Sequence, residues 1–149
     1  LLDSVNMINA PIIAKDRDID IAEVKHERES DYHTLIRLTV KTERQTRTVA
    51  GTLFANSSPR IVDVHGVLIE AELAKSVLYI RNDDKPGFIG ELGSALGSAG
   101  VNIATFNLGR NTQGGEALAL ISIDGDIPAA LLDDVTNIPH VLQAKALTF

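Results

Sequence analysis

The sequence predicts an α+β protein in two parts, with the boundary between residues 75 and 76. Residues 1–75 contain short runs of β-prone residues separated by polar turns, which is the pattern of a strand meander. Residues 76–149 alternate apolar runs typical of strands with two segments of helical periodicity. The polar joint Glu72–Ser76 separates these two patterns, and we place the boundary there.

Composition excludes several classes of function. The chain has 149 residues, of which 44% are hydrophobic, enough for a packed core. The net charge of −6 argues against a general nucleic-acid or membrane-surface binder, and no apolar run approaches the roughly 20 residues that cross a bilayer. The chain has no cysteine, which excludes disulfides, thiolate metal sites and cysteine nucleophiles. We expect a cytoplasmic location.

The first part is expected to begin with a helix over residues 1–17, with Pro11 in a first turn. The first residues show no signal-peptide pattern. They lack an initiator methionine and look like the middle of a helix, so we expect the chain to be a piece of a longer protein. Apolar residues at β-like spacing predict strands over Ile19–Glu29, Thr34–Thr42, Thr48–Phe54, Arg60–Val64 and Val67–Ala71. Alternation in Thr34–Thr42 predicts a half-buried strand, and His65-Gly66 predicts a tight hairpin turn.

The second part opens with a predicted buried strand at Val77–Ile80, followed by the polar turn Arg81–Lys85. Pro86 suits the first turn of a helix, and Asp84 is placed to cap that turn through its carboxylate. The apolar stripe of this helix comprises Phe88, Ile89, Leu92, Leu96 and Ala99. Gly100 is expected to end the helix in the left-handed conformation.

The remaining elements complete a β-α-β-β-α-β order, the ferredoxin-like arrangement. After a second strand that starts at Val101, they are a hairpin loop at Thr112–Gly115, a strand at Glu116–Ile123, a helix after Pro128 that buries Leu131, Leu132 and Val135, and a strand at Val141–Leu147. In such a unit the helices cover one face of the sheet. The other face and an edge strand are left for a partner, often a second copy.

No catalytic motif or metal-ligand spacing is present, so we assign no catalytic residue and no metal ligand. The scattered histidines are interpreted as surface or turn residues: His26, His33, His65 and His140. Four glycines lack dinucleotide-binding spacing and are interpreted as allowing close packing of the helix on the sheet or on a partner: Gly90, Gly93, Gly97 and Gly100. A basic set is interpreted as a solvated strand face, with an anion site as the alternative: Arg37, Lys41, Arg44, Arg47 and Arg60.

The start of the first helix in the second part is a candidate ligand site. The free amides of Gly87, Phe88 and Ile89 suit the carboxylate of a small amino acid. The Asp84 carboxylate would face the ligand ammonium, and the amides of Asn82 and Asn102 would orient it. On these residues alone, plain cap and turn roles for Asn82, Asp84 and Asn102 remain an equal alternative.

The same residues resemble a known domain family. Asp84–Gly90, followed by Gly100–Ala104, is similar to the signature of an ACT domain, a small ligand-binding regulatory module. Val5–Lys15 and Val49–Phe54 resemble the intervening, or allosteric substrate-binding, domain of long-form D-3-phosphoglycerate dehydrogenases. The resemblance implies an incomplete α/β intervening domain over residues 1–75 and a ferredoxin-like ACT domain over residues 76–149.

This resemblance implies a regulatory fragment of an NAD-dependent enzyme of serine biosynthesis. The catalytic and NAD-binding domains would lie upstream, so this piece is expected to carry no catalytic residue and no cofactor of its own. L-Serine would bind between paired ACT domains and inhibit, with Asn82 and Asp84 from one subunit and Asn102 from the other. Some relatives carry a ring-bearing residue at the position of Asn82. In the first part, Leu68 and Glu72 stand where some relatives carry anion-binding basic residues.

Two alternatives remain open. One is a purely structural oligomerisation module without serine control. The other is the regulatory region of an iron–sulfur L-serine dehydratase, which joins the same two domain types. The stretch Asn9-Ala10-Pro11 favours the dehydrogenase. For the leading interpretation the expected partners are L-serine and further copies of the chain, paired through the ACT domain, with neither nucleic acid nor membrane.

Overall fold

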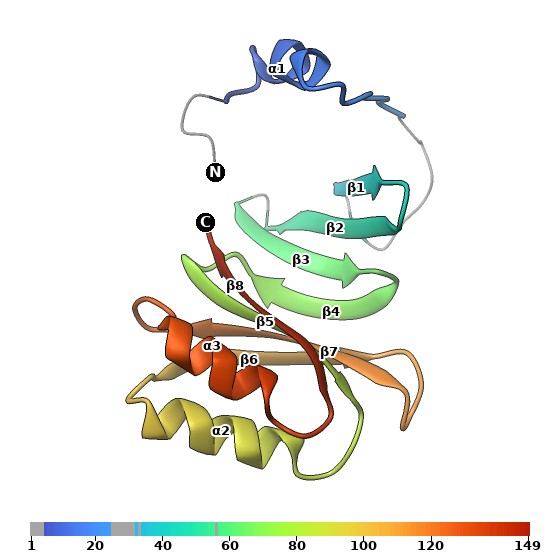
Figure 1. Cartoon of the computed structure of the whole chain (residues 1–149). Coiled ribbons are helices and arrows are strands. Elements are labelled where there is room, and N and C mark those ends of the chain that lie inside the picture. Colours follow the sequence, from blue (N-terminus) through green and yellow to red (C-terminus); the bar gives the residue numbers. More distant parts are fainter. Residues whose placement is uncertain (1–4, 25–31, 33, 56) are drawn as a thin grey trace. The chain divides into compact units, whose positions relative to one another are not determined.

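The structure is a computed structural model that describes residues 5–24, 32, 34–55 and 57–149. The chain divides into two compact units, Leu1–Asp31 and Tyr32–Phe149, shown in Figure 1. The two sheets of the fold both belong to the second unit. The predicted domain boundary between residues 75 and 76 therefore falls inside a compact unit and stays a prediction.

The first unit contains the short helix α1, Ala10–Asp16, with Pro11 in its first turn as predicted. Ahead of the helix, the Asn6 side-chain oxygen accepts hydrogen bonds from the amides of Ile8 and Asn9, at 2.9 and 3.1 Å. The Asn9 side chain accepts one in return from the Asn6 amide at 2.7 Å. The strand expected over 19–29 is wrong for residues 19–24, which form neither helix nor strand, and its remainder lies outside the described residues.

A four-stranded antiparallel meander, sheet A, opens the second unit. Its strands are β1 (Leu35–Lys41), β2 (Thr46–Phe54), β3 (Ser58–Val64) and β4 (Val67–Glu72), in the order β1-β2-β3-β4. The four strands predicted here are thus confirmed. The prediction that the first is half-buried is wrong, because β1 is an outer strand exposed on both faces, with Ile36 70% exposed.

The turn between β3 and β4 explains the pair His65-Gly66. Both residues take the left-handed conformation, with φ of 55° and 82°. Such a pair of positive φ angles belongs to the tight hairpin turn whose twist matches the flanking strands. Glycine adopts it without steric cost, and histidine is among the side chains that tolerate it.

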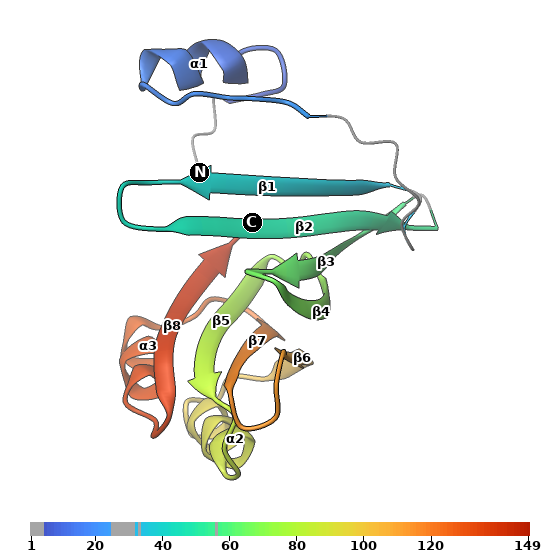
Figure 2. The same cartoon turned by 90° about the vertical axis from the view of Figure 1, so that its right-hand side faces the viewer.

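Sheet B follows and confirms the predicted ferredoxin-like ACT fold. Its strands are β5 (Ser76–Asp83), β6 (Ile103–Arg110), β7 (Glu116–Ile123) and β8 (Val141–Thr148), in the antiparallel order β6-β7-β5-β8. Helices α2 (Phe88–Ser98) and α3 (Ala129–Thr136) lie together on one side of this sheet (Figures 1 and 2). Gly100, with φ of 69°, ends α2 as predicted.

The main core fills the space between the two helices and sheet B. Its fully buried members are Leu78, Ile80, Leu92, Leu96, Ala119, Ile121 and Val135. Two residues of the predicted helix stripe lie outside it, since Ile89 and Ala99 are exposed. An added Cβ at Gly90, Gly93 or Gly97 would meet no atom within 4 Å, so these glycines do not serve close packing of α2 on the sheet. That part of their interpretation is wrong.

A second core covers the other face of sheet B. It joins Val64, Ile69 and Ala71 of sheet A to Val77, Leu118 and Leu120 of sheet B. An added Cβ at Gly109 of β6 would overlap the carbonyl oxygen of Leu68 and lie 2.9 Å from Val67 Cγ1. The sheet face expected to be free for a partner is thus partly covered by β3 and β4 of the same chain. In the described part of the chain, no helix is long and apolar enough to span a membrane.

Candidate functional site

The segment from the end of β5 to the first residues of α2 holds five of the six predicted site residues. Helix α2 begins at Phe88, and its N-cap is Gly87 with φ of 98°, a conformation that suits glycine. No side chain of the described residues caps the helix, so the predicted capping role of Asp84 is wrong. Pro86 lies in the turn before the helix rather than in its first turn.

The amides at the start of α2 remain open within the chain. Among the described residues, the N–H groups of Phe88 and Ile89 have no hydrogen-bond acceptor. The Phe88 ring is buried in the main core, whereas Ile89 is 55% exposed. Unpaired amides and the helix dipole together favour an anion at this position.

Asp84 is engaged by the hairpin that connects β6 and β7. Its Oδ2 accepts hydrogen bonds from Arg110 Nη1 at 2.5 Å and from the Gly114 amide at 2.9 Å. Its own amide donates to the Gly115 carbonyl at 2.7 Å. The hydrogen bond from Gly114 and then that from Arg110 hold the pKa of the Asp84 carboxyl below its ordinary value. Asp84 is therefore ionised at neutral pH and already has one cation beside it.

Asn82 carries the unusual feature of the site. Its side chain is only 2% exposed and shares the helix-facing side of β5 with Leu78 and Ile80, since alternate residues point the same way. Its Nδ2 donates to the Asp83 carbonyl at 2.8 Å, but its buried Oδ1 has no partner in the part of the chain that the structure describes. A buried acceptor left unpaired costs on the order of 1–3 kcal/mol. Such groups call for a specific explanation.

Asn102 lies away from the other five residues. It precedes β6 at the opposite end of α2, an 11-residue helix, which separates it from the helix start by roughly 16 Å along the axis. Its Nδ2 donates to Asp124 Oδ2 at 2.6 Å, and its carbonyl accepts from the Asp124 amide at 3.1 Å. A single chain therefore brings together Asn82, Asp84 and the helix start, but not Asn102.

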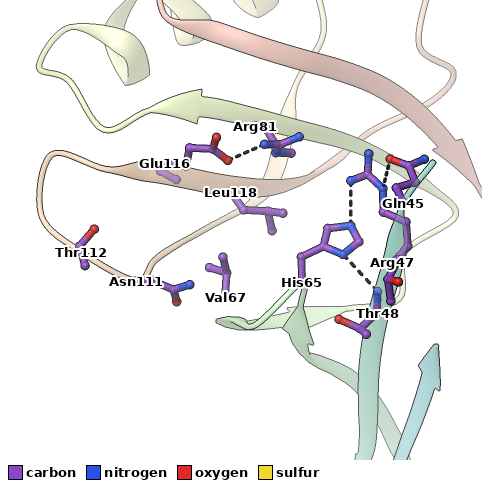
Figure 3. A pocket seen from close by; sticks show the side chains of 12 residues that line it. Gln45, Arg47, Thr48, His65, Val67, Arg81, Asn111, Thr112, Glu116 and Leu118 are labelled. Atoms are coloured by element: carbon purple, nitrogen blue, oxygen red, sulfur yellow. Dashed lines mark hydrogen bonds and ion pairs between the residues drawn. The ribbon is translucent and has the colours of Figure 1, made fainter. Parts of the chain in front are cut away.

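A cavity of about 720 Å³ lies between the two sheets, at the end of sheet A that carries the His65 turn (Figure 3). Polar and charged side chains contribute most of its wall: Gln45, Thr46, Arg47, Thr48, His65, Arg81, Asn111, Thr112 and Glu116. Val67, Ala117 and Leu118 supply the apolar remainder. The sequence interpretation did not anticipate this cavity.

The polar groups of this cavity form two clusters. His65 accepts a hydrogen bond from the Thr48 amide at Nδ1, at 3.1 Å, and its Nε2 lies 3.2 Å from Arg47 Nη1. Arg81 pairs with Glu116 across β5 and β7. Burial, followed by the charges of Arg47 and Arg81, lowers the pKa of His65 below its ordinary value. At neutral pH the imidazole is therefore neutral.

Three sequence interpretations change here. His65 does more than turn a hairpin, because its ring binds the Thr48 amide. Arg81 belongs to β5 rather than to a turn, and the alternation that begins at Val77 would have placed it opposite the helices. The basic set is not a uniform solvated face. Arg37 pairs with Asp63 at 3.5 Å, and Arg60 pairs with Glu72 at 2.6 Å. Of the five residues in that set, Arg47 is the one that lines this cavity. His26 and His33 lie outside the described residues.

Comparison with known proteins identifies both parts of the chain. Residues 1–65 match the family model of the D-3-phosphoglycerate dehydrogenase intervening domain, and residues 76–140 match that of the ACT domain. The chain is similar to D-3-phosphoglycerate dehydrogenases of Bacillus subtilis, with 34% identity, Methanocaldococcus jannaschii, with 32%, and Mycobacterium tuberculosis, with 31%.

These alignments include nearly all of the chain but a small share of each relative. They cover 97%, 99% and 97% of the chain, and 27%, 28% and 27% of the respective relatives. The chain thus spans about a quarter of the length of the curated relatives it matches. It belongs to the D-3-phosphoglycerate dehydrogenase family, in the region where an intervening domain is followed by an ACT domain.

Proposed function

We propose that this chain is the regulatory part of an NAD-dependent D-3-phosphoglycerate dehydrogenase and that it binds L-serine between the ACT domains of two copies. The observation that carries the proposal is the buried Oδ1 of Asn82, which has no partner within residues 5–24, 32, 34–55 and 57–149, close in sequence to a helix start with open amides. NAD would be bound by the parent enzyme outside this region. As part of such an enzyme, the chain would act in the cytoplasm.

The turn before α2 offers a serine zwitterion one partner for each of its groups. The amides of Gly87, Phe88 and Ile89 suit the carboxylate. Both contacts of Asp84 go to Oδ2, and its Oδ1 has no partner among the described residues, so Oδ1 would receive the ammonium. The Asn82 Oδ1 would then accept from a donor of the ligand, which removes the cost of the unpaired acceptor.

The position of β6 supports a contribution of Asn102 from a second copy. β6 is an outer strand of sheet B, and Asn102 precedes it while Arg110 ends it. If two β6 strands pair antiparallel across a two-fold axis, the start of one lies opposite the end of the other. Asn102 of one copy would then approach Arg110 of the other, and with it Asp84.

Serine bound at such a seam would regulate by favouring one arrangement of the subunits. The seam exists only when the two sheets are paired, so serine has a higher affinity for that state and shifts the population toward it. The effect on activity of the parent enzyme is limited by this difference in affinity. Feedback inhibition by the end product is the expected consequence.

A complementation experiment tests the two-copy site. Calorimetry with L-serine should show saturable binding to the unaltered chain, and none to Asp84→Asn or Asn102→Ala alone. Asparagine at position 84 can still accept the hydrogen bonds of Arg110 and Gly114, so the fold is retained. When the two variants are mixed and allowed to exchange, a mixed dimer contains one intact site and one doubly altered site. Binding should return with half the sites per mixed dimer.

Three results would refute the serine site. They are binding of serine to Asp84→Asn with unchanged heat, no binding to the mixture although mixed dimers form, and no binding to the unaltered dimer. L-Alanine, which has the same zwitterion without the hydroxyl, serves as the ligand control. It should bind more weakly because it lacks the hydroxyl donor.

A purely structural role is the second candidate, and one observation favours it. The Asp84 carboxylate already ties the turn before α2 to the β6–β7 hairpin, which is a sufficient reason for an acid at this position. An oligomerisation module predicts a stable dimer that shows no saturable binding of any amino acid. Sedimentation and calorimetry on the same sample separate the two candidates.

A further inference from the structure

His65 is held in one tautomer by the backbone of β2. Its amide donates to the Thr48 carbonyl at 3.0 Å, and the Thr48 amide donates to the His65 ring at Nδ1, at 3.1 Å. An amide is only a donor, so Nδ1 must be the unprotonated nitrogen. In a neutral imidazole the proton is then on Nε2.

This assignment leaves two donors facing each other. Nε2–H lies 3.2 Å from Nη1 of Arg47, and a guanidinium has no acceptor. The opposite tautomer only moves the conflict to the Thr48 amide, which the backbone pairing with His65 holds in place. Protonation makes both ring nitrogens donors. Neither neutral tautomer of His65 nor its protonated form can therefore accept hydrogen bonds from both the Thr48 amide and Arg47.

An acceptor with two lone pairs would resolve this conflict. The Arg47 guanidinium is also bound to Gln45 through Nε at 3.0 Å, which directs its remaining donors toward the ring. Arg81, on the neighbouring sheet, adds a second positive charge that acts on His65, although Glu116 partly compensates it. The surrounding cavity of about 720 Å³ has room for a small metabolite.

We propose that this cavity is a binding site for a small oxyanion, whose oxygens accept hydrogen bonds from His65 Nε2–H and from the guanidinium of Arg47. The ligand is a carboxylate or a phosphoryl group carried by a small molecule. The site lies between the sheets and meets the proposed serine site only at the β6–β7 hairpin, where Asn111 and Thr112 line the cavity while Arg110 and Gly114 bind Asp84. It does not depend on the proposed serine site, and either proposal can fail without the other.

A matched set of variants isolates the two donors. His65→Asn keeps a residue that favours the left-handed turn, and its side-chain oxygen can still accept from the Thr48 amide, but Nε2–H is lost. Arg47→Gln removes the guanidinium. Arg44→Gln is the control, because it removes the same charge from the turn that leads into β2, at a residue that does not line the cavity.

The test is a titration of the full chain with inorganic phosphate and, separately, with malonate at constant ionic strength, followed by NMR. Saturable binding of either anion should weaken by about tenfold or more in both His65→Asn and Arg47→Gln, as expected for a lost charge-assisted contact. It should stay within about twofold in Arg44→Gln. Tighter binding of phosphate or of malonate distinguishes a phosphoryl from a carboxylate ligand.

The imidazole nitrogens give a readout that a merely structural role would not change. In the free protein, the ¹⁵N shifts should show that the ring proton is on Nε2. Anion binding should raise the pKa of His65, as the charge of Asp63 does, and so oppose the lowering by the charges of Arg47 and Arg81. The proposal is overturned if neither anion binds saturably, if His65→Asn binds as tightly as the unaltered chain, or if the free ring carries its proton on Nδ1.

Discussion

The carboxylate of Asp84 and the guanidinium of Arg110 form an ion pair, with 2.5 Å between Oδ2 and Nη1. The pair joins the turn before α2 to the end of β6. Asp84, which was expected to cap the helix, instead holds the β6–β7 hairpin against that turn. The same pair places the end of an outer strand beside the candidate ligand site. A rearrangement of the β6 edge that moves Arg110 would therefore change the contacts of the Asp84 carboxylate.

Arg110→Gln should raise the pKa of the Asp84 carboxyl toward its ordinary value, because one of the two main hydrogen bonds that lower it is lost. The lowered pKa contributes stability that is complete above the unfolded pKa of about 4 and is lost as the pH falls through the folded pKa. NMR titration of the Asp84 side chain measures the shift. Arg81→Gln, which breaks the pair with Glu116, is the control and should leave Asp84 unchanged.

Asn82→Leu should stabilise the free chain while it removes serine binding. Leucine keeps the branching of the asparagine side chain, and the substitution eliminates a buried acceptor that has no partner among the described residues, so a gain of about 1–3 kcal/mol is expected. Urea unfolding measures the gain, and addition of serine should no longer raise the unfolding midpoint. A loss of stability in this variant would show that the Asn82 carboxamide is fully satisfied in the protein.

Gly109→Ala should destabilise the contact between the two sheets, because the added methyl overlaps the Leu68 carbonyl oxygen. Overpacking of this kind costs about 1–3 kcal/mol. Gly93→Ala is the matched control, since its methyl meets no atom within 4 Å and the residue lies inside α2. There alanine should add about 0.5–1 kcal/mol. Equal effects of the two changes in thermal unfolding would contradict the close approach of β4 and β6.

Leu96→Ala and Ile89→Ala separate the buried and exposed members of the predicted helix stripe. Leu96 is fully buried, and its truncation should cost about 2–5 kcal/mol through lost burial and a cavity. Ile89 is more than half exposed, so its truncation should change stability by less than about 0.5 kcal/mol. Equilibrium unfolding of both variants in urea provides the comparison. A large loss in Ile89→Ala would place that side chain in an interface.

Local sequence was sufficient for the elements of the second unit. Apolar runs and turn residues predicted each strand of sheet B and both helices that pack on it. A strand or helix with one face in the core places apolar residues at the repeat of its own backbone geometry, and the sequence shows that repeat. Gly100 and His65-Gly66 were found for a related reason. These residues have positive φ angles, which few residue types adopt readily, so the residue type predicts the conformation.

Only the tertiary structure decided which polar groups meet. Asp84 lies 26 positions from Arg110 in the chain, and His65 lies 18 positions from Arg47. No local periodicity encodes such pairs, because they depend on how the hairpins fold onto each other. The exposure of β1 and the cover that β3 and β4 give to sheet B were hidden for the same reason. The alternation of a strand specifies two faces, and only the packing of the whole unit determines what lies against each.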